Sequence, residues 1–407
     1  MKAKQIDVYL NIDSNDLLVG HLFVDVIKGK EIYSFSYDNS YLNIKNNFVI
    51  DPELSLIEGR QYKKDSSSIY GFISDTIPDR WGRNLLIRNE KRKALLEKRN
   101  PEKFGDSDFL LGVNDFTRQG ALRYKLHTSY KFLGEGGKQS VPKLVYINKL
   151  EQLCFDIDAL SDDDLKDLFN PGSSLGGARP KATVFDNNGA LYIAKFSHKQ
   201  DDYDVPKFEY FANLLAIECG LKVPECKLIK GNKSIFLEKR FDRDGSKRIP
   251  YVSAMTLLGA SDGDNELYSY LDLIDLINAY SVNPNSDLIE MFRRLVFNCI
   301  IHNGDDHLRN HGFLFNGKGY ELSPVFDINP DPNAIGLSLS FDGFEHMFSF
   351  ANCLEISKFF GLNKEQAIII IKKMVTTVSS KFDVIAKKAK ISEAELKKFI
   401  YIKENNF

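Results

Sequence analysis

The residues best suited to chemistry lie in a short polar segment, Asn303-Gly-Asp-Asp-His-Leu-Arg-Asn310. A second polar segment, Ser323-Pro-Val-Phe-Asp327, follows a predicted hairpin. Asp305 and Asn310 are five positions apart, and Asp327 lies 17 positions further on. A carboxylate can orient a hydroxyl group and accept its proton, and carboxylate and amide oxygens are the hard ligands that Mg²⁺ prefers. These residue types therefore indicate phosphoryl transfer assisted by a divalent cation.

The order Asp, four residues, Asn, hairpin, Asp is the arrangement of a protein-kinase catalytic centre. The hairpin is predicted from His311–Phe315 and Lys318–Leu322, which flank the turn Asn316-Gly317. It would bring Asp327 back to the end of a strand beside Asn310. An apolar helix, Leu288 to Ile301, is predicted before the segment, with its start marked by Ser286 and Asp287.

Two other interpretations of the segment stay open at this stage. His302, His307 and His311 cluster here, and the last two have the i, i+4 spacing of zinc ligands on a helix. However, Asn303-Gly304 and His311-Gly312 favour a loop instead of a helix. The second alternative is an Asx-rich loop without chemistry. The kinase-like interpretation is favoured over both because residues upstream support it.

Upstream, Lys195 ends the predicted strand Leu191–Lys195, on the same face as two aliphatic residues. Such a lysine either extends to the surface or is held for an anion. The glycine-rich turn Gly172-Ser-Ser-Leu-Gly-Gly-Ala178 precedes this hairpin, and backbone N–H groups in such turns can approach phosphates closely. Glu209, predicted in the first turn of the next helix, either pairs with a lysine or complements the helix N-terminus.

The remaining pattern predicts a β-rich half followed by an α-rich half. The chain has 407 residues, which corresponds to two or three domains. Strands are predicted around Asp7–Leu10 and His21–Val24, and a helical stretch is predicted over 69–96. The overlapping range 88–99 is rich in basic residues, which form either a solvated face or a phosphate- or partner-binding face. Further predicted elements are strands 181–185, 190–196, 226–230 and 234–239, a helix over 207–219 that stops at Gly220, and helices beyond about Pro250.

Composition excludes several classes of function. The formal charge is −2, from 54 Lys+Arg and 56 Asp+Glu, which argues against nucleic-acid binding through bulk charge. The five cysteines are odd in number and never spaced Cys-x-x-Cys, so we expect neither a disulfide framework nor a thiolate zinc site. Because neither a signal peptide nor a membrane-length apolar run is evident, we expect a cytoplasmic protein.

With these residues in view, nearly the whole chain resembles the HipA serine/threonine kinases, which are toxins of type II toxin–antitoxin modules. In the N-terminal part the resemblance lies in 35–42, 77–86, 108–112 and Gly120-Ala121. In the middle, Ser174-Leu-Gly-Gly-Ala-Arg-Pro-Lys181 resembles the family's glycine-rich loop, and Glu238-Lys-Arg-Phe-Asp-Arg243 resembles its hinge. The catalytic segment corresponds to 305–310 and Asp327.

The resemblance implies an α+β, bilobal, protein-kinase-like fold. It would comprise an N-terminal subdomain over 1–125, a β-rich nucleotide-binding lobe over 126–250 and an all-helical C-terminal lobe over 251–407. It also implies ATP and Mg²⁺ as cofactors, Asp305 as the catalytic base and Asn310 and Asp327 as metal ligands. The implied ATP-binding residues are Lys195, Ser174, Gly176, Gly177, Ala178, Lys181, Lys239, Phe241 and His307, with Glu209 as a lysine partner.

The resemblance further implies regulation and partners. Ser174, or Ser173 as an alternative, would be autophosphorylated. This phosphorylation would switch the kinase off, because a phosphate there would compete with the γ-phosphate for the loop amides. The implied partners are a HipB-like helix-turn-helix antitoxin, DNA only through that antitoxin, and a protein substrate such as an aminoacyl-tRNA synthetase. Alternatives are a small-molecule kinase and a catalytically weak module that binds an antitoxin and DNA.

The sequence departs from the family pattern at three positions. Asp306 adds a carboxylate beside Asp305, which either tunes metal binding or is solvated. Arg179 and Pro180 replace the more common polar residues of the loop, and Pro180 removes a backbone donor.

Overall fold

A computed structural model describes residues 3–45, 47–63, 69–133, 141–155, 179–405 and 407. The chain divides into two compact units: unit 1 comprises Met1–Lys199 and Asp242–Val252, and unit 2 comprises Gln200–Phe241 and Ser253–Phe407. This division differs from the three consecutive segments predicted from the sequence, whose boundaries at 125 and 250 stay a prediction.

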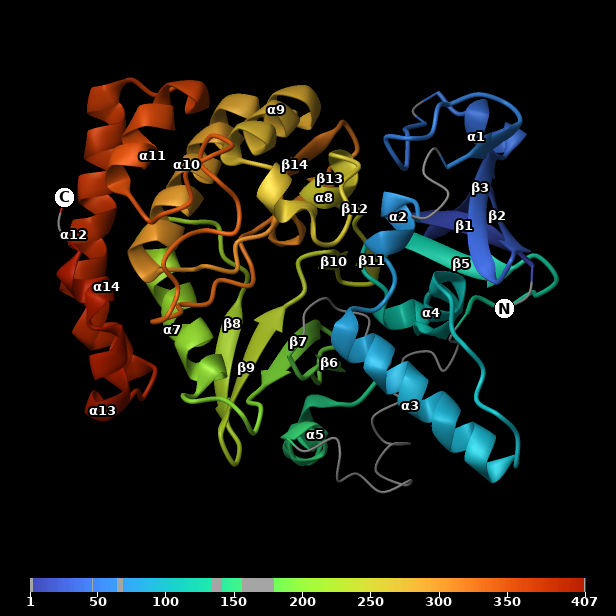
Figure 1. Ribbon diagram of the computed structural model, residues 1–407, viewed down its shortest axis with the longest axis horizontal. Helices are drawn as coiled ribbons and strands as arrows, with labels where there is room; N and C mark the ends of the chain where they lie inside the picture. Colours follow the sequence, from blue (N-terminus) through green and yellow to red (C-terminus); the bar gives the residue numbers. More distant parts are fainter. Residues whose placement is uncertain (1–2, 46, 64–68, 134–140, 156–178, 406) are drawn as a thin grey trace. The chain divides into compact units, whose positions relative to one another are not determined.

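Unit 1 is built on an antiparallel sheet with the strand order β4-β3-β2-β1-β5 (Figure 1). Alternate residues of β1, such as Ile6, Val8 and Leu10, are buried in one hydrophobic core with residues of the neighbouring strands. The strands predicted around Asp7 and His21 are therefore confirmed. The bounds are β1 (Lys4–Ile12), β2 (Asn15–Ile27), β3 (Lys30–Tyr37), β4 (Arg60–Tyr62) and β5 (Leu122–Leu126).

The helical stretch predicted over 69–96 is two helices, because the chain breaks at Pro78. Proline lacks an N–H and disfavours helical geometry in the residue before it. The longer helix starts where the Asp79 carboxylate accepts a hydrogen bond of 2.7 Å from the Gly82 N–H. The helices of unit 1 are α1 (Asn39–Leu42), α2 (Gly71–Ser74), α3 (Arg80–Leu96), α4 (Asp106–Gly112) and α5 (Ile147–Phe155).

A buried carboxyl group, Asp51, joins α2 to the preceding loop. Its two oxygens accept hydrogen bonds from the N–H groups of Phe72 (3.1 Å) and Glu53 (3.0 Å). Burial raises the pKa of Asp51 to about 7, although hydrogen bonds from Phe72 and Gly71 and the charge of Lys63 oppose this shift. The folded state therefore holds a proton that the unfolded chain releases near the ordinary pKa of 3.8.

We expect the stability of Asp51→Asn to increase relative to that of the wild type as the pH rises. The pKa is raised in the folded state, so the wild type loses stability between about pH 4 and 7, at up to about 1.4 kcal/mol per pH unit. Asparagine does not ionise and escapes this loss. Thermal midpoints of both proteins at pH 5 and pH 8 test this. A midpoint difference that is the same at both values would contradict it.

The end of unit 1 contains the predicted hairpin of β6 (Lys181–Phe185) and β7 (Leu191–Phe196). In its turn, the Asp186 carboxylate accepts hydrogen bonds from the N–H groups of Asn188 and Ala190, and Gly189 has a positive φ of 85°. Unit 1 also contains β10 (Arg243–Asp244) and β11 (Lys247–Arg248), and the chain passes to unit 2 within β12 (Tyr251–Ser253).

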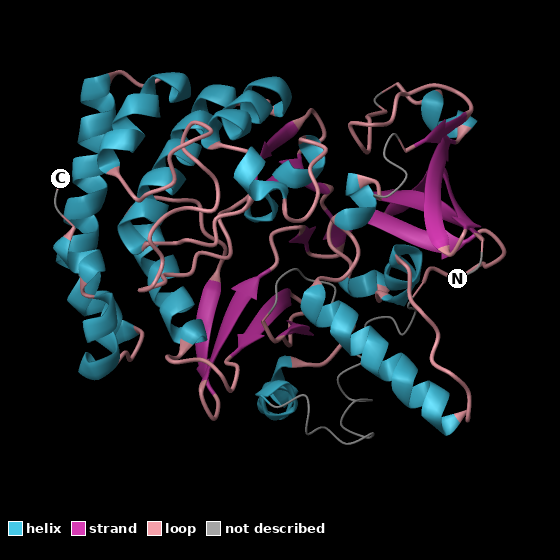
Figure 2. Cartoon of the chain, in the orientation of Figure 1, coloured by secondary structure: helices cyan, strands magenta, loops and turns pink. Residues whose placement is uncertain are grey.

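Helices are the main regular elements of unit 2 (Figure 2). Its strands form two hairpins that match the predicted ones, β8 (Cys226–Lys230) with β9 (Ser234–Lys239), and β13 (Gly312–Phe315) with β14 (Tyr320–Leu322). The helices are α7 (Val205–Glu218), α8 (Ala254–Leu257), α9 (Tyr270–Tyr280), α10 (Pro284–Ile301), α11 (Phe350–Ile356), α12 (Lys364–Lys388), α13 (Glu393–Leu396) and α14 (Tyr401–Glu404). Among the described residues, no helix is both long and apolar enough to cross a bilayer.

The central element of unit 2 is α10, which is buried along most of its length and packs against α9, α11 and α12. It begins at Pro284 after the N-cap Asn283, two to three residues before the predicted start at Ser286 and Asp287. The prediction was wrong because proline at the first helical position is itself a start signal. Asp287 instead accepts hydrogen bonds from the Ser281 hydroxyl (2.7 Å) and the Leu322 N–H (3.0 Å), which tie α10 to β14.

Candidate active site

The polar segment begins at the C-terminal end of α10. His302 ends the helix in the left-handed conformation with φ 55°, and its ring stacks on Phe348 and Tyr401 at centroid distances of 4.5 and 4.2 Å. Asn303 is held to the last helical turn, because its side-chain N–H group donates to the Asn298 side-chain oxygen at 3.1 Å. The loop therefore leaves the helix in a defined direction.

Asp305 lies at the exposed tip of this loop. Its side chain is 81% exposed, and one carboxylate oxygen is 3.8 Å from His307 Nε2. The backbone around it is fixed, because the Asp305 carbonyl accepts hydrogen bonds from the His307 N–H (3.2 Å) and the Asn310 side chain (2.8 Å). A carboxylate that is accessible on a fixed backbone suits the role of a base for an external hydroxyl group.

The same contact orients Asn310. A carbonyl oxygen can only accept, so the Asn310 group facing the Asp305 carbonyl must be the amide NH₂. The amide oxygen Oδ1 therefore points elsewhere, and no hydrogen bond from the described part of the chain reaches it. Asn310 itself lies in a 3₁₀ turn, Leu308–Asn310, immediately before β13. An oriented amide oxygen of this kind suits a hard cation.

Asp306, the next residue, is buried and bonded instead of solvated. It accepts a hydrogen bond from the Tyr270 hydroxyl and lies 3.0 Å from His311 Nε2. Tyr270 in turn accepts a hydrogen bond of 3.2 Å from the Asn298 side chain. The interpretation of Asp306 as a solvated carboxylate was therefore wrong. Its side chain anchors the loop in the interior of unit 2, whereas that of Asp305 is exposed.

The protonation states within this network follow from burial and charge. Burial by itself would raise the pKa of Asp306, but the charge and hydrogen bond of His311 and the Tyr270 hydrogen bond hold that pKa below its usual range. Burial and the Asp306 charge raise the pKa of Tyr270 well above its usual value. Asp306 therefore stays an ionised acceptor and Tyr270 a protonated donor.

Asp327 lies in a loop, five residues after β14 ends at Leu322, so its predicted place at a strand end was wrong. Pro324 explains the early end, because a proline cannot donate to a strand ladder. The Ser323 N–H still donates to the Gly312 carbonyl at 2.9 Å, so the hairpin pairing extends one residue beyond β14, and the placement of Asp327 beside Asn310 stays a prediction. Asp327 has a positive φ of 57°, a conformation that is uncommon outside glycine and recurs at functional sites.

The part of the predicted hinge up to Phe241 belongs to unit 2, and Phe241 contacts this loop. The ring of Phe241 contacts that of Phe326, the neighbour of Asp327, at a centroid distance of 5.4 Å. Lys239, at the end of β9, uses its N–H group to bond the Glu225 carbonyl, and its side chain pairs with the Glu225 carboxylate at 3.4 Å. Phe241 therefore lies close to the segment that carries Asp327.

Two buried lysines face each other in unit 1. Lys181 and Lys195 are directly paired across β6 and β7, so their side chains share one face. Both residues are at most 9% exposed, which argues against the interpretation of Lys195 as a surface-reaching lysine. Lys181 Nζ lies 3.8 Å from the Asp79 carboxylate. Two opposed ammonium groups are unfavourable unless anionic groups lie nearby, and the Asp79 carboxylate is one such group.

The other predicted site residues have mixed outcomes. Glu209 is buried, but it is the fifth residue of α7, whose first turn contains no acidic residue, so its predicted place was wrong. His307 lies near Asp305 as described above. The described residues do not bring His302, His307 and His311 together as a metal-binding group, which removes the zinc interpretation of this loop. Ser173, Ser174, Gly176, Gly177 and Ala178 lie outside the described residues.

A family model described as "HipA-like C-terminal domain" matches residues 173–382, just over half of the 407-residue chain. The chain belongs to the HipA-like family. The match includes Lys195 and the whole loop from His302 to Asp327. The solved HipA of Shewanella oneidensis MR-1, in a complex with HipB and operator DNA, has the same fold: the TM-score is 0.68 at 17% identity, covering 98% of this chain and 95% of that one. The predicted kinase-like α+β class is thereby confirmed.

Two sequence relatives are described as kinases. A "Putative kinase" of Haemophilus influenzae is 28% identical over 194 residues, which cover 41% of this chain and 56% of that protein. The "Putative kinase Y4mE" of Sinorhizobium fredii is 28% identical over 133 residues, covering 30% of this chain and 31% of that protein. The HipA-like chain therefore spans about half or less of the length of these relatives.

The structure also shows residues that sequence reasoning missed. Tyr270 and Asn298 belong to α9 and α10, and nothing in their local sequence distinguishes them from other polar positions of amphipathic helices. The spacing of Asn298 and Asn303, which bracket the end of the helix, is the one local signal. In this HipA-like chain the loop is thus supported by a side chain more than thirty residues away in sequence from Asp305.

Proposed function

We propose that this chain is an ATP- and Mg²⁺-dependent serine/threonine protein kinase of the HipA type. The observation that carries the proposal is one loop that presents the exposed Asp305 carboxylate and the Asn310 amide oxygen, with the Asn310 amide oriented by its hydrogen bond to the Asp305 backbone carbonyl. Membership of the HipA-like family and the matched "Putative kinase" relatives support it.

In this proposal Asp305 orients the attacking hydroxyl group of the protein substrate and accepts its proton. Its exposure allows a macromolecular substrate to reach it, which favours protein over a buried small-molecule substrate. Asn310 and Asp327 supply hard oxygen ligands that fit Mg²⁺, and the ion, when bound, neutralises charge on the transferred phosphoryl group. His307, 3.8 Å from Asp305, contributes positive charge when protonated.

We assign nucleotide phosphate binding to Lys181 and Lys195 and contact with the adenine to the hinge at Lys239–Phe241. The two lysines are buried and paired, and the hinge ends at Phe241 beside the Asp327 segment. The switch at Ser174, or Ser173, is part of the proposal on the basis of the family resemblance. We assign Glu209 the role of a lysine partner because it is a buried carboxylate early in α7.

The biological setting is proposed from the same family. The solved Shewanella HipA forms a complex with HipB and operator DNA. We propose that this chain likewise acts in the cytoplasm as a growth-arresting toxin. It would bind a HipB-like antitoxin, contact DNA through that partner and phosphorylate a translation component such as an aminoacyl-tRNA synthetase. The net charge of −2 is compatible with DNA contact through a basic partner.

The direct test uses the purified chain with γ-labelled ATP and Mg²⁺, alone and with a cell lysate. We expect label in the chain itself or in a lysate protein, and peptide mapping to place self-incorporated phosphate on Ser174 or Ser173. Label only in a small molecule would favour the metabolite-kinase alternative. Absence of label in any molecule, with antitoxin and DNA binding retained, would favour the catalytically weak module.

We expect Lys195→Met to weaken ATP binding by about ten- to hundredfold, because a charge-assisted hydrogen bond is worth about 1.5–3 kcal/mol. Calorimetric titration with Mg-ATP measures this. Lys247→Met is the matched control, since Lys247 lies in the same unit but pairs with Asp13 on the exposed surface. Equal ATP affinities for the two variants, both with the wild-type thermal midpoint, would contradict the assigned role of Lys195.

A further inference from the structure

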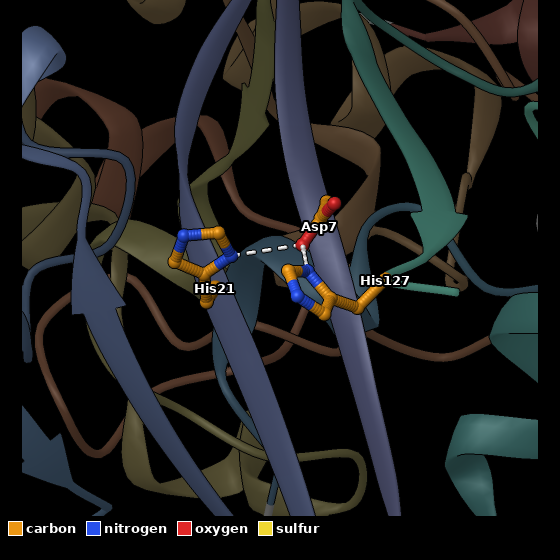
Figure 3. A group of neighbouring side chains, drawn as sticks. All are labelled: Asp7, His21 and His127. Carbon is orange, nitrogen blue, oxygen red and sulfur yellow. Dashed lines mark hydrogen bonds and ion pairs between the residues drawn. The ribbon is translucent and has the colours of Figure 1, made fainter. Parts of the chain in front are cut away.

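Three side chains of unit 1 converge on one carboxylate oxygen, far in sequence from the loop described above. Asp7 Oδ1 lies 2.8 Å from His21 Nδ1 and 2.9 Å from His127 Nδ1 (Figure 3). The two imidazole rings are nearly perpendicular, with centroids 5.7 Å apart. In Figure 3 a nitrogen of each ring faces the Asp7 carboxylate.

The antiparallel register brings these residues together. Asp7 lies on β1 directly opposite His21 on β2 and opposite Lys125 on β5. His127 is two positions beyond Lys125, and its N–H group donates to the Gln5 carbonyl at 3.0 Å. Since side chains alternate along strands, these residues share the face opposite to Ile6 and Val8, which belong to the core. The cluster therefore sits on the outer face of the sheet.

Asp7 is unusual for that face, because it is only 6% exposed. Burying a carboxylate is unfavourable unless positive charge or a metal compensates it. The two imidazoles differ in exposure: the His21 side chain is 23% exposed and the His127 side chain is 53% exposed. One side of the cluster is thus enclosed, while the His127 side is open to solvent.

The donor set and its spacing fit a transition-metal ion. Two imidazole nitrogens and a carboxylate oxygen are common ligands of Zn²⁺, with one position left for water. In a tetrahedral site with bonds of about 2.0–2.1 Å, ligand atoms lie about 3.3 Å apart. The three candidate atoms all lie within 4.8 Å of one another, so small side-chain rotations are enough to surround an ion.

A fourth side chain supports this geometry. Asp38, which precedes α1, has a carboxylate oxygen 3.8 Å from His21 Nε2. A carboxylate near the second ring nitrogen of a histidine favours the tautomer whose other nitrogen binds a metal, and it orients the ring. His21 Nδ1, the atom that faces Asp7, is the nitrogen that this tautomer makes available.

We propose that Asp7, His21 and His127 form a binding site for a divalent transition-metal ion of the Zn²⁺ class. The site joins β1 and β2 to the chain that follows β5, and the ion would stabilise these three segments against separation. It is independent of the proposed Mg²⁺ ligands, which are an amide and a carboxylate without imidazole. A cluster held by hydrogen bonds alone, without a metal, is the outcome that would overturn the proposal.

The test is a titration of the full, tag-free, chelator-treated chain with Co²⁺, followed by visible absorption. Four-coordinate Co²⁺ absorbs much more strongly than six-coordinate Co²⁺, so the band separates this site from an octahedral Mg²⁺-type site. We expect one strongly absorbing ion per chain, its displacement by Zn²⁺, and a rise in the thermal midpoint with Zn²⁺.

Two variants and one control variant test which residues bind the ion. His127→Ala is the main one, because its exposed side chain is the least important for folding, and we expect it to weaken Co²⁺ binding at least tenfold. Asp7→Asn, which keeps the side-chain shape, is expected to do the same. His346→Ala is the control, since this half-buried histidine of unit 2 contacts the Leu337 carbonyl. Lack of the strong band in the wild type, or wild-type affinity in both folded His127→Ala and Asp7→Asn, overturns the proposal.

Discussion

Asp305→Asn is expected to lower the rate of phosphoryl transfer about 10²- to 10⁴-fold, which is the range that a positioned general base contributes. The amide keeps the shape of the side chain but cannot accept the proton of the attacking hydroxyl group. The side chain is 81% exposed, so folding does not depend on burying its charge. Labelled-phosphate incorporation, at saturating ATP, measures the effect on the rate.

The properties that Asp305→Asn leaves unchanged are as informative as the size of its effect on the rate. We expect ATP affinity and the thermal midpoint to stay near the wild-type values, because Asp305 acts on the hydroxyl group and not on the nucleotide. Asp383→Asn is the matched control: Asp383 is an exposed carboxylate of α12 that pairs with Lys403 at 2.6 Å. Undiminished phosphorylation by Asp305→Asn would remove this residue from the mechanism and leave the kinase proposal without its base.

The sequence predicted the elements that carry the site well where local signals are strong. The strands β6, β8 and β9 have the predicted bounds to the residue, because each flanks a turn whose residues favour one geometry. Gly220 ends α7 with a positive φ of 78°, as its place after a helical pattern predicts. The hairpin that returns the chain from Asn310 toward Asp327 was found in the same way.

The errors arise where a single residue overrides a periodic pattern. Pro78 divides a stretch whose apolar spacing is helical on both sides, and Pro284 starts α10 earlier than the polar residues after it indicate. Pro324 similarly ends β14 before Asp327. In each case the chain geometry of proline decides the boundary, while hydrophobic periodicity averages over several residues and does not resolve it.

Contacts between residues distant in sequence could not be predicted from the sequence alone. Asp7 and His21 are opposite each other only through the β1–β2 register, which contains a shift between Val8 and Tyr9. His127 joins them through β5, more than a hundred residues away. The same holds for Asp306, whose partner Tyr270 lies on α9. An acidic residue beside a second carboxylate has no local signal that distinguishes burial from solvation.

Asp306→Ala is expected to destabilise unit 2 by about 2–6 kcal/mol, because two buried polar groups lose their acceptor at about 1–3 kcal/mol each. The variant leaves the Tyr270 hydroxyl and the His311 imidazole without their acceptor in a buried position. Because these contacts also hold the loop that carries Asp305, we expect the rate of phosphoryl transfer to fall in the protein that still folds. Chemical unfolding followed by far-ultraviolet circular dichroism measures the first effect.

A carboxylate in a neighbouring loop provides the matched control. Asp262 is exposed and pairs with Arg309 at 2.8 Å, so Asp262→Ala is expected to change the stability by no more than about 1 kcal/mol. The two variants remove the same group from nearby segments, and they differ in burial. Equal effects on the free energy of unfolding would contradict the importance that we give to the buried network.

The pH dependence of the stability tests whether the charge of Asp306 causes this destabilisation. Its pKa is lowered in the folded state, so its contribution is complete above the ordinary pKa of 3.8 and is lost as the pH falls from there through the lowered value. The stability difference between the wild type and Asp306→Ala should therefore shrink below about pH 4. Tyr270→Phe, which removes the donor and keeps the ring, should cost less, about 1–3 kcal/mol. A double-mutant cycle between Asp306 and Tyr270 then separates the hydrogen bond from the loss of packing, because the interaction energy isolates the part that requires both groups.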